Sequence, residues 1–303
     1  MSDITVLGIF VADISFSGNK LPTMGETILG DSYNIGPGGK GCNQAIAISR
    51  LGGKVNFISK LGNDDYGKLA LNKLKKDNIN TSNIIISNEH KTGVAGIHVD
   101  RNSGKNAITV VRGAPSSLTS KEIDTNLIKQ SKIFLTQLEI PIEVTLHCLK
   151  AAKEHGLINI LNPAPACKLS NDFFKLVDYF TPNETEASFY VDHNVETHED
   201  AEKAAMQLLE KGIKNVVITL GEKGAFFANS NEKFSLPIAN LSNPVVDTTG
   251  AGDAFNAGFA AALTEGQNIR DALKFASATA GLSTTKIGTA NSMPSREEIE
   301  KLL

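Results

Sequence analysis

An acidic residue, Asp253, directly follows a turn of small residues, Gly250 to Gly252. Apolar residues then recur at helical spacing, which predicts a buried helix that begins at this turn. Glycine permits positive φ, and the free amides of a first helical turn bind anions such as phosphate. A carboxylate beside a bound phosphate can accept the proton of an attacking hydroxyl. The simpler alternative is a first-turn aspartate that only complements the helix dipole.

A second glycine-rich stretch, Gly36 to Gly41, fits the pattern G-x-G-x-x-G. A dinucleotide site needs a strand just before this pattern and an acidic residue about 20 positions later. The preceding residues are polar and Leu61 takes the place of the acid, so we interpret the match as false. Lys40, Asn43 and Gln44 then share one helical face, and this donor-rich face suits the hydroxyls of a polyol. A solvated helix end is the alternative.

Strand-like and helix-like segments alternate along the chain. The clearest strands are 55–60, 133–137, 157–161 and 215–220, and the clearest helices are 66–78, 141–155, 201–211 and 269–285. This alternation predicts an α/β fold: a three-layer sandwich with helices on both faces of a mostly parallel, twisted sheet, in a single domain over 1–303. Segments at about 14–33 and 92–112 lack a helical period and predict a small second sheet, which we interpret as a lid.

Several noted residues directly follow predicted strands: Asp13, Glu139, Asn162, Asn183 and Gly221. In open α/β sheets, ligands bind outside the carboxyl ends of the strands. We therefore expect these residues to lie on one rim of the sheet together with Asp253.

Composition excludes several classes of protein. The net charge of −3 gives no electrostatic reason to bind nucleic acid or an acidic membrane, and no apolar run has the length of a membrane-spanning helix. Cys42, Cys148 and Cys167 are odd in number and widely spaced, which argues against disulfides and structural zinc. With no basic, apolar leader at the N-terminus, these features predict a cytoplasmic protein.

The chain resembles the ribokinase family, within the superfamily that also includes adenosine kinases and fructokinases. Five stretches carry the resemblance: Gly38 to Ala45, Gln137 to Glu139, Asn162 to Ala166, Thr181 to Ala187 and Asp247 to Asp253. They occur in the order typical of the family and span nearly the full length. The resemblance implies an ATP-dependent sugar kinase that transfers the γ-phosphoryl to the 5-hydroxyl of D-ribose.

The resemblance also implies roles for individual residues. Asp253 would be the catalytic base, and Gly250, Ala251 and Gly252 the amide cradle for the transferred phosphoryl group. The positions that match sugar contacts are Val11, Asp13, Gly38, Gly39, Lys40, Asn43, Glu139 and Asp253. Those that match ATP contacts are Asn183, Thr219, Gly221, Gly224, Gly252 and Ser277. Mg²⁺ would arrive with ATP, its water shell held by Asn183 and Glu186. A monovalent cation, K⁺, would lie near Asp247, Thr249, Ser283, Lys286, Gly288 and Ser292.

Two positions depart from the family pattern. Val11 stands where many bacterial ribokinases carry Asn, and valine cannot hydrogen-bond a sugar hydroxyl. This raises 2-deoxyribose, another sugar or a nucleoside as alternative acceptors. Ser277 stands where a His is common near the adenine, which we expect to alter base packing only. A catalytically silent sensor on the same fold is the alternative outside the enzymes, and the family also implies a homodimer formed through the lid.

Overall fold

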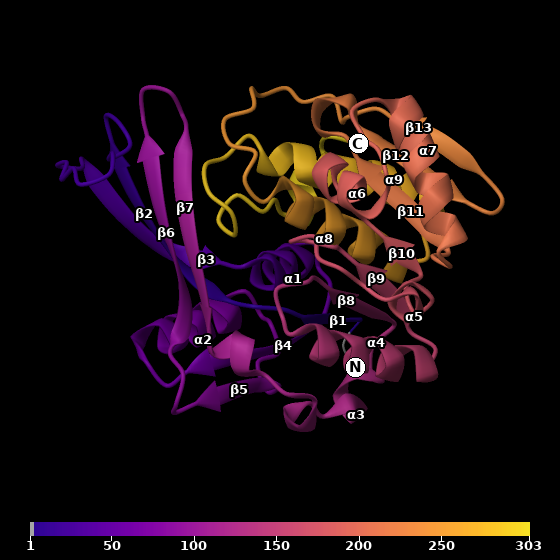
Figure 1. Ribbon diagram of the computed structural model, residues 1–303, viewed down its shortest axis with the longest axis horizontal. Helices are drawn as coiled ribbons and strands as arrows, with labels where there is room; N and C mark the ends of the chain where they lie inside the picture. Colours follow the sequence, from indigo (N-terminus) through magenta and orange to yellow (C-terminus); the bar gives the residue numbers. More distant parts are fainter. Residues whose placement is uncertain (1–2) are drawn as a thin grey trace.

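Nine strands form the central sheet of the protein, whose computed structural model describes residues 3–303 (Figure 1). They are β1 (Ile4–Leu7), β4 (Val55–Gly62), β5 (Ile84–Ser87), β8 (Ile133–Thr136), β9 (Ile158–Leu161), β10 (Tyr179–Phe180), β11 (Asn215–Thr219), β12 (Ala225–Asn229) and β13 (Lys233–Leu236). Their order in space is β13-β12-β11-β10-β9-β8-β1-β4-β5. Neighbouring strands are parallel except for the antiparallel pairs β11–β12 and β12–β13 at one edge. The predicted mostly parallel sheet is confirmed.

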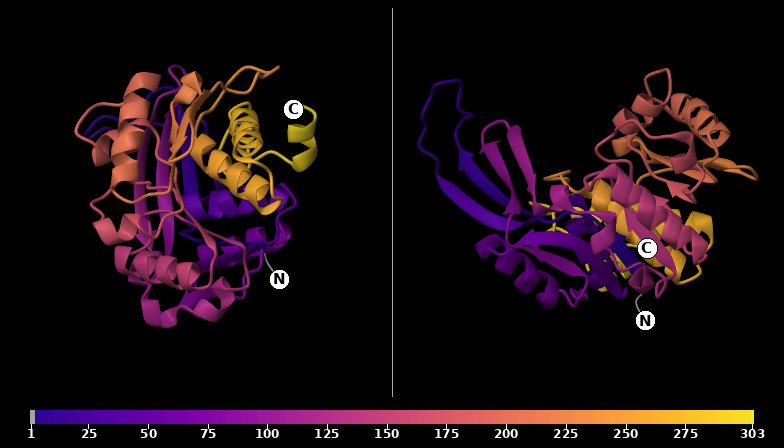
Figure 2. Two further views of the ribbon diagram at one scale, coloured as in Figure 1. Left: turned by 90° about the vertical axis from the view of Figure 1, so that its right-hand side faces the viewer. Right: turned by 60° about the horizontal axis from the view of Figure 1, so that its bottom comes forward.

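Helices cover both faces of this sheet (Figure 2). One face carries α1 (Lys40–Arg50), α2 (Asp65–Lys76), α8 (Ala251–Thr264), α9 (Ile269–Ser283) and α10 (Arg296–Glu300). The other carries α3 (Thr125–Ile128), α4 (Ile142–Glu154), α5 (Asn171–Phe174), α6 (Glu184–Tyr190) and α7 (His198–Glu210). The side chains of a strand alternate between these two apolar layers: Ile4 and Val6 pack into the first and Leu7 into the second. The predicted α/β sandwich is therefore confirmed.

A separate small sheet has four strands in the order β3-β2-β6-β7. They are β2 (Val11–Gly18), β3 (Ser32–Gly38), β6 (Thr92–Asp100) and β7 (Asn106–Gly113). β2 and β6 are parallel, whereas β3 and β7 pair antiparallel at the two edges. Figure 1 shows this sheet standing beside the carboxyl end of the central sheet, with its far end extending away from the helical layers.

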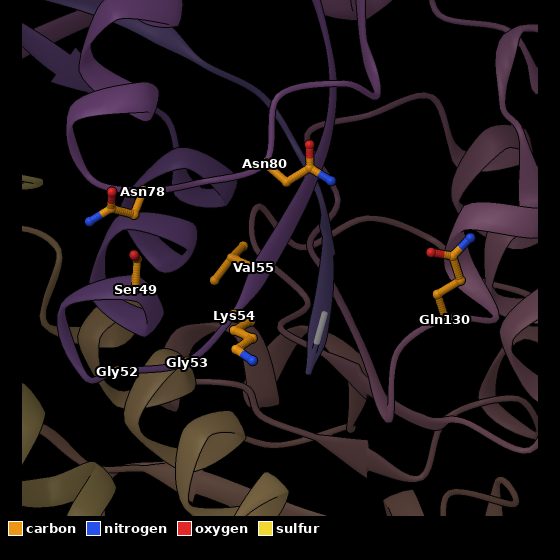
Figure 3. A pocket seen from close by; sticks show the side chains of 8 residues that line it. All are labelled: Ser49, Gly52, Gly53, Lys54, Val55, Asn78, Asn80 and Gln130. Carbon is orange, nitrogen blue, oxygen red and sulfur yellow. The ribbon is translucent and has the colours of Figure 1, made fainter. Parts of the chain in front are cut away.

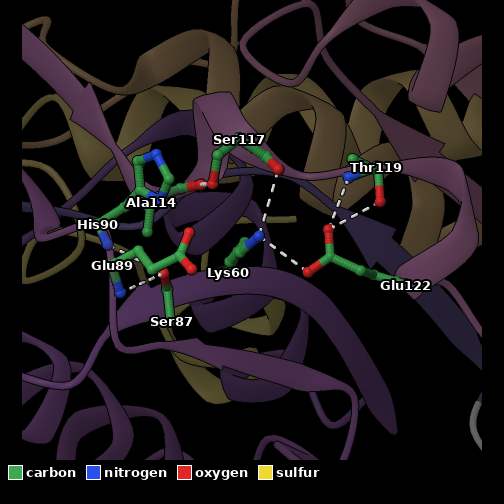
Figure 4. Close-up of polar contacts among 8 residues, drawn as sticks. All are labelled: Lys60, Ser87, Glu89, His90, Ala114, Ser117, Thr119 and Glu122. Carbon is green, nitrogen blue, oxygen red and sulfur yellow. Dashed lines mark hydrogen bonds and ion pairs between the residues drawn. The ribbon is translucent and has the colours of Figure 1, made fainter.

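Hydrogen bonds join the small sheet to the end of β4. Asp64 caps α2 by accepting from the amide of Gly67, and its other oxygen accepts from the amide of Thr92 at 2.8 Å. The Thr92 hydroxyl accepts in turn from the amide of Gly62. Nearby, the buried ammonium of Lys60 donates to Glu122 at 2.8 Å and to the carbonyl of Ser117 at 3.2 Å (Figure 4). The bonds to Thr92 hold the first residue of β6 against the end of β4. The bonds of Lys60 to Ser117 and Glu122 hold the segment that follows β7.

Several details differ from the sequence expectations. A strand, β3, does precede the glycine pattern at Gly36 to Gly41; its first residues are exposed and so show no apolar alternation. Between β2 and β3, residues 19–31 form no strand. The edge strand β5 and the short helices α3 and α5 were not predicted; a helix of four residues is too short to show a helical period. Within residues 3–303, no helix is both long and apolar enough to cross a membrane.

Candidate active site

Asp253 lies in the first turn of α8, at the rim where the central strands end. The helix begins after Gly250, whose φ of 82° is a left-handed conformation that side chains disfavour. The amides of this first turn have no acceptor within the helix. A Cβ placed on Gly252 would meet no atom within 4 Å, so the turn is open on that side. The predicted turn is thus accessible to a ligand. The amide of Ala251 donates to the carbonyl of Thr248 at 3.2 Å, whereas the amides of Gly250 and Gly252 make no such bond within the described residues.

The carboxylate of Asp253 is 5% exposed and holds a hydrogen bond on each oxygen. Asn43 Nδ2 donates to Oδ2 at 2.8 Å, and Gln44 Nε2 donates to Oδ1 at 3.0 Å. Burial raises the pKa of Asp253, while the Lys40 ammonium and the two amides oppose that rise. A buried carboxylate whose proton affinity is increased in this way is suited to take a proton.

Other charged groups gather around Asp253. Glu139 accepts a hydrogen bond from the amide of Lys40 at 3.0 Å, and burial raises the pKa of its carboxyl to about 7. Burial likewise raises the pKa of Asp13 to about 6. Burial alone would lower the pKa of the Lys40 ammonium, but the carboxylates of Asp253, Glu139 and Glu186 raise it. One cation among several buried carboxylates makes this a strongly polar site within a low-dielectric surrounding.

Two glycines allow the backbone to approach these groups. A Cβ on Gly38 would lie about 2.1 Å from the Asp13 carboxylate, so any side chain there would displace it. Gly39 has a φ of 89°, and a Cβ on it would lie 2.6 Å from the carbonyl oxygen of Ile9. The predicted close approach of the backbone at the start of α1 is therefore present.

Two cavities meet at Gly252, next to Asp253. The smaller, of about 140 Å³, is lined by Lys40, Asn162, Ala164, Thr181, Asn183, Glu186, Thr219, Gly250, Gly252, Asp253 and Asn256. The larger, of about 600 Å³, includes Ala251 and all six residues predicted to contact ATP: Asn183, Thr219, Gly221, Gly224, Gly252 and Ser277. Asn183, Thr219 and Gly252 line both. The two cavities are therefore adjacent, and Asp253 lines the smaller one.

Some predicted sugar positions do not line these cavities. Val11 is 3% exposed and belongs to an apolar cluster with Ala95, where a Cβ on Gly93 would lie 2.9 Å from its Cγ1. Asp13, on the same face of β2, accepts a long hydrogen bond from Thr289 at 3.4 Å. These residues lie on the small sheet rather than at the start of α8.

Asn183 and Glu186 form a reciprocal cap at the start of α6. Asn183 Oδ1 accepts from the amide of Glu186 at 2.8 Å, and Glu186 Oε2 accepts from the amide of Asn183 at 3.0 Å. The second carboxylate oxygen of Glu186 makes no such contact, and the side chain lines the smaller cavity. Burial raises the pKa of this carboxyl. Asn183 and Glu186 thus cap α6, and one carboxylate oxygen of Glu186 takes no part in the cap.

The residues predicted around a monovalent cation come from two neighbouring loops. Asp247 joins the loops, since its carboxylate accepts from the amides of Thr249 and Gly288, both at 2.9 Å. Ser283 and Ser292 are buried, and their hydroxyls donate to backbone carbonyls. The ammonium of Lys286 binds Glu298, and the only oxygen of this residue is its backbone carbonyl.

A third hollow, of about 500 Å³, lies at the opposite ends of the strands and near the start of β4 (Figure 3). Its lining residues are Ser49, Gly52, Gly53, Lys54, Val55, Asn78, Asn80 and Gln130. It contains no carboxylate and none of the predicted site residues.

Sequence reasoning missed the buried amides behind Asp253. Gln44 was noted only as a possible sugar contact, and Gln137 only as part of a motif. In the structure, Gln44 is wholly buried and links Asp253 to both Gln137 and Asn162. The available signal was a polar residue directly after each apolar strand, at Gln137 and Asn162.

Comparisons with known proteins agree with this arrangement. Residues 1–296 match the pfkB family of carbohydrate kinases. The chain is 40% identical to the ribokinase of Haemophilus influenzae over 302 residues, which is 99% of this chain and 98% of that protein. It is 35% identical to the deoxyribokinase of Salmonella typhi over 304 residues, with 99% and 98% covered. The structure of Arabidopsis thaliana ribokinase complexed with ribose and ATP superposes with a TM-score of 0.93, at 32% identity and with 99% and 98% covered.

The fold and the paired cavities therefore define a sugar kinase that uses ATP. The chain belongs to the pfkB family of carbohydrate kinases.

Proposed function

We propose that this protein is a ribokinase, which transfers the γ-phosphoryl group of ATP to the 5-hydroxyl of D-ribose and releases D-ribose 5-phosphate and ADP. The observation that carries this proposal is the position of Asp253, a buried carboxylate that lines the smaller cavity beside Gly252, which lines both cavities. The larger cavity would bind ATP, and the sugar would bind between the smaller cavity and the small sheet. The full-length similarity to ribokinases supports the choice of sugar.

The reaction requires few covalent contributions from the protein. Asp253 accepts the hydroxyl proton as the sugar oxygen attacks the γ-phosphorus, and the bond to the β–γ bridging oxygen breaks. The amides of Gly250, Ala251 and Gly252 stabilise the charge on the transferred group, as donors in an oxyanion hole do. Lys40 contributes a positive charge close to the same place. Placement of the two substrates and neutralisation of charge thus account for most of the catalysis.

Asp13, Asn43 and Glu139 would bind the sugar hydroxyls, with Gly38 and Gly39 allowing the sugar to approach the backbone. The small sheet would act as a lid that excludes water, which otherwise competes for the phosphoryl group. Its attachment to β4 through Asp64 and Thr92 provides a fixed base for such a movement.

Two cations fit the residues present. Glu186 has a carboxylate oxygen available toward the smaller cavity, so it and Asn183 could hold the water shell of Mg²⁺ bound to ATP. Asp247, with hydroxyl and carbonyl oxygens from 283–292, forms a hard, weakly charged donor set that suits K⁺ better than a transition metal. Such ions neutralise phosphate charge and support the loop beside Gly250. Activity in K⁺ that exceeds activity in Na⁺ or Li⁺ at equal ionic strength would support the second site.

The alternative to a ribokinase is a kinase for 2-deoxyribose, and the two differ in which sugar accepts the phosphoryl group. The apolar side chain of Val11 cannot hydrogen-bond a 2-hydroxyl, and a deoxyribokinase is also similar over the full length. The test measures kcat/KM for ribose, 2-deoxyribose, hexoses and nucleosides in a coupled enzyme assay of ADP release. Highest efficiency with ribose supports the proposal. Phosphorylation of nucleosides with no activity on free pentoses would overturn it, and full turnover by Asp253→Asn would remove the catalytic role.

We also propose that two copies pair through the small sheet. Phe16, Tyr33, Ile35 and Val111 share one face of this sheet by register, and all four are exposed. An apolar face of this kind is commonly covered by a partner. Val111→Lys should give a monomer in light scattering. Val110→Lys, on the opposite face of the same strand, is the matched control and should keep the dimer; a wild-type monomer contradicts the proposal.

A cytoplasmic location is part of the same proposal. The described structure holds three free cysteines, Cys42, Cys148 and Cys167, and a reducing compartment would keep them so.

A further inference from the structure

A chain of buried amide side chains lies behind Asp253. Its members come from the start of α1 (Gln44) and from the ends of β8 (Gln137) and β9 (Asn162). Gln44 Nε2 donates to Asp253 Oδ1 at 3.0 Å and to Asn162 Oδ1 at 3.2 Å, and Gln44 Oε1 accepts from Gln137 Nε2. Asn162 Nδ2 then donates to the carbonyl of Thr181 at 3.3 Å. Three elements of the fold are thus joined to one oxygen of the carboxylate.

The direction of each hydrogen bond in this chain is fixed by its ends. The carbonyl of Thr181 can only accept, so Asn162 must turn its NH₂ group toward it and its oxygen toward Gln44. An ionised Asp253 can also only accept. Both hydrogens of the Gln44 amide are therefore used, and its oxygen must face the NH₂ group of Gln137. If any one of these amides were turned by 180°, two acceptors or two donors would face each other, which is costly in a buried site.

Asn43 differs from Gln44 in this respect. Its NH₂ group donates to Asp253 Oδ2 at 2.8 Å, but its own oxygen is buried without a hydrogen-bond partner. Asp253 is therefore the only side chain in the described structure that orients this amide. Asn43 can therefore exchange its bond to Asp253 for a sugar hydroxyl at little cost, whereas Gln44 cannot.

We propose that Gln44 is a positioning residue that holds Oδ1 of Asp253, so that Oδ2 is the oxygen that receives the substrate proton. This inference rests on the proposed function. When the sugar binds, Asn43 turns from Oδ2 to the sugar and the reacting hydroxyl takes its place. The O–H bond breaks toward Oδ2, the new P–O bond forms at the sugar oxygen, and the electron pair of the old bond leaves with ADP.

The amide of Gln44 also stabilises the ionised form of Asp253. The other groups that face this carboxylate are the Lys40 ammonium and the carboxylates of Asp13, Glu139 and Glu186. Only Lys40 among them favours the ionised form. Loss of Gln44 would therefore raise the pKa of the base and free its side chain to rotate.

The test compares Gln44→Met with the wild type across pH. We expect kcat to fall about tenfold to hundredfold at neutral pH, the loss that follows removal of a hydrogen bond to a charged group. The rising limb of the pH profile should move to higher pH, so part of the activity returns there. KM for ATP should stay within about twofold, because the amide chain does not line the larger cavity.

Three further variants make the test decisive. Gln137→Met does not touch Asp253 and should produce a smaller change of the same kind; it also decides the matter if Gln44→Met does not fold. Asn43→Ala should mainly raise KM for the sugar. Ser49→Ala, on the same helix but bonded to the carbonyl of Asp77, is the matched control and should behave as the wild type.

Folded Gln44→Met and Gln137→Met proteins with wild-type kcat and an unshifted pH profile would overturn the inference. Asp253→Asn separates this result from failure of the proposed function. If Asp253→Asn is inactive while both amide variants behave as the wild type, only the role of Gln44 is wrong. If Asp253→Asn is fully active, the proposed catalytic role is wrong as well.

Discussion

Replacing Gly252 by alanine should strongly slow phosphoryl transfer without destabilising the protein. Gly252 lies in the first turn of α8 without a positive φ, and a Cβ on it would meet no atom within 4 Å. Alanine loses less backbone entropy than glycine in a helix, so we expect a gain of about 0.5 kcal/mol and a melting temperature higher by about 1–2 °C. The added methyl group would, however, project into the space that both cavities share.

That space is where the proposed mechanism places the transferred phosphoryl group. Displacing the group from its amide donors should lower kcat by about 10²–10³-fold, as removal of one oxyanion-hole donor does. Gly250→Ala is the matched comparison. Its φ of 82° would force alanine into a left-handed conformation at a cost of about 1–2 kcal/mol, so this variant should lose stability as well as activity.

Thermal unfolding followed by circular dichroism gives the stability, and ADP release coupled to a recording enzyme gives kcat and KM. A Gly252→Ala protein that unfolds like the wild type and retains more than about a tenth of its kcat would refute the reasoning, because the open space would then not hold the phosphoryl group. A loss of stability above about 2 kcal/mol would refute the packing argument instead.

Four other outcomes are expected. Asp253→Asn should lower kcat by about 10²–10⁴-fold in steady-state assays, while its melting temperature at pH 8 is no lower, because a buried charge is removed. Glu139→Gln tests the raised pKa of Glu139. The wild type should lose stability, on the order of 2 kcal/mol, as pH rises from the usual 4.5 of a glutamate to about 7. The variant should lose less, because only the raised pKa values of other carboxyls such as Asp13 and Asp253 remain; urea unfolding at pH 5 and 8 measures the difference. Lys60→Met, which leaves Glu122 without its ammonium, should cost about 1–3 kcal/mol in urea unfolding with kcat unchanged; a neutral result would show that the ion pair contributes nothing. Val11→Asn should raise the ratio of kcat/KM for ribose over 2-deoxyribose about tenfold, and an unchanged ratio would mean that this side chain does not reach the sugar.

The sequence by itself determined the main sheet and the start of α8. Apolar runs of strand length alternate with segments of helical period along the chain. This pattern predicts a parallel sheet, because the strands of such a sheet are buried on both faces by the helices that connect them. The turn at Gly250 was equally predictable, since its φ of 82° requires glycine. The positions after strand ends, such as Asn162 and Asn183, could be assigned to one rim from topology alone.

Only the tertiary structure decided how Asp253 is held. Gln44 is 209 residues from Asp253 in the chain, and no local pattern distinguishes an amide that binds a sugar from one that binds a carboxylate. The exposed strand β3 was missed for a related reason: edge strands of a thin sheet bury few side chains and so leave no periodic signal. Secondary structure follows from spacing along the chain. The ionisation and orientation of Asp253 depend instead on groups from distant segments, which come together only when the chain is folded.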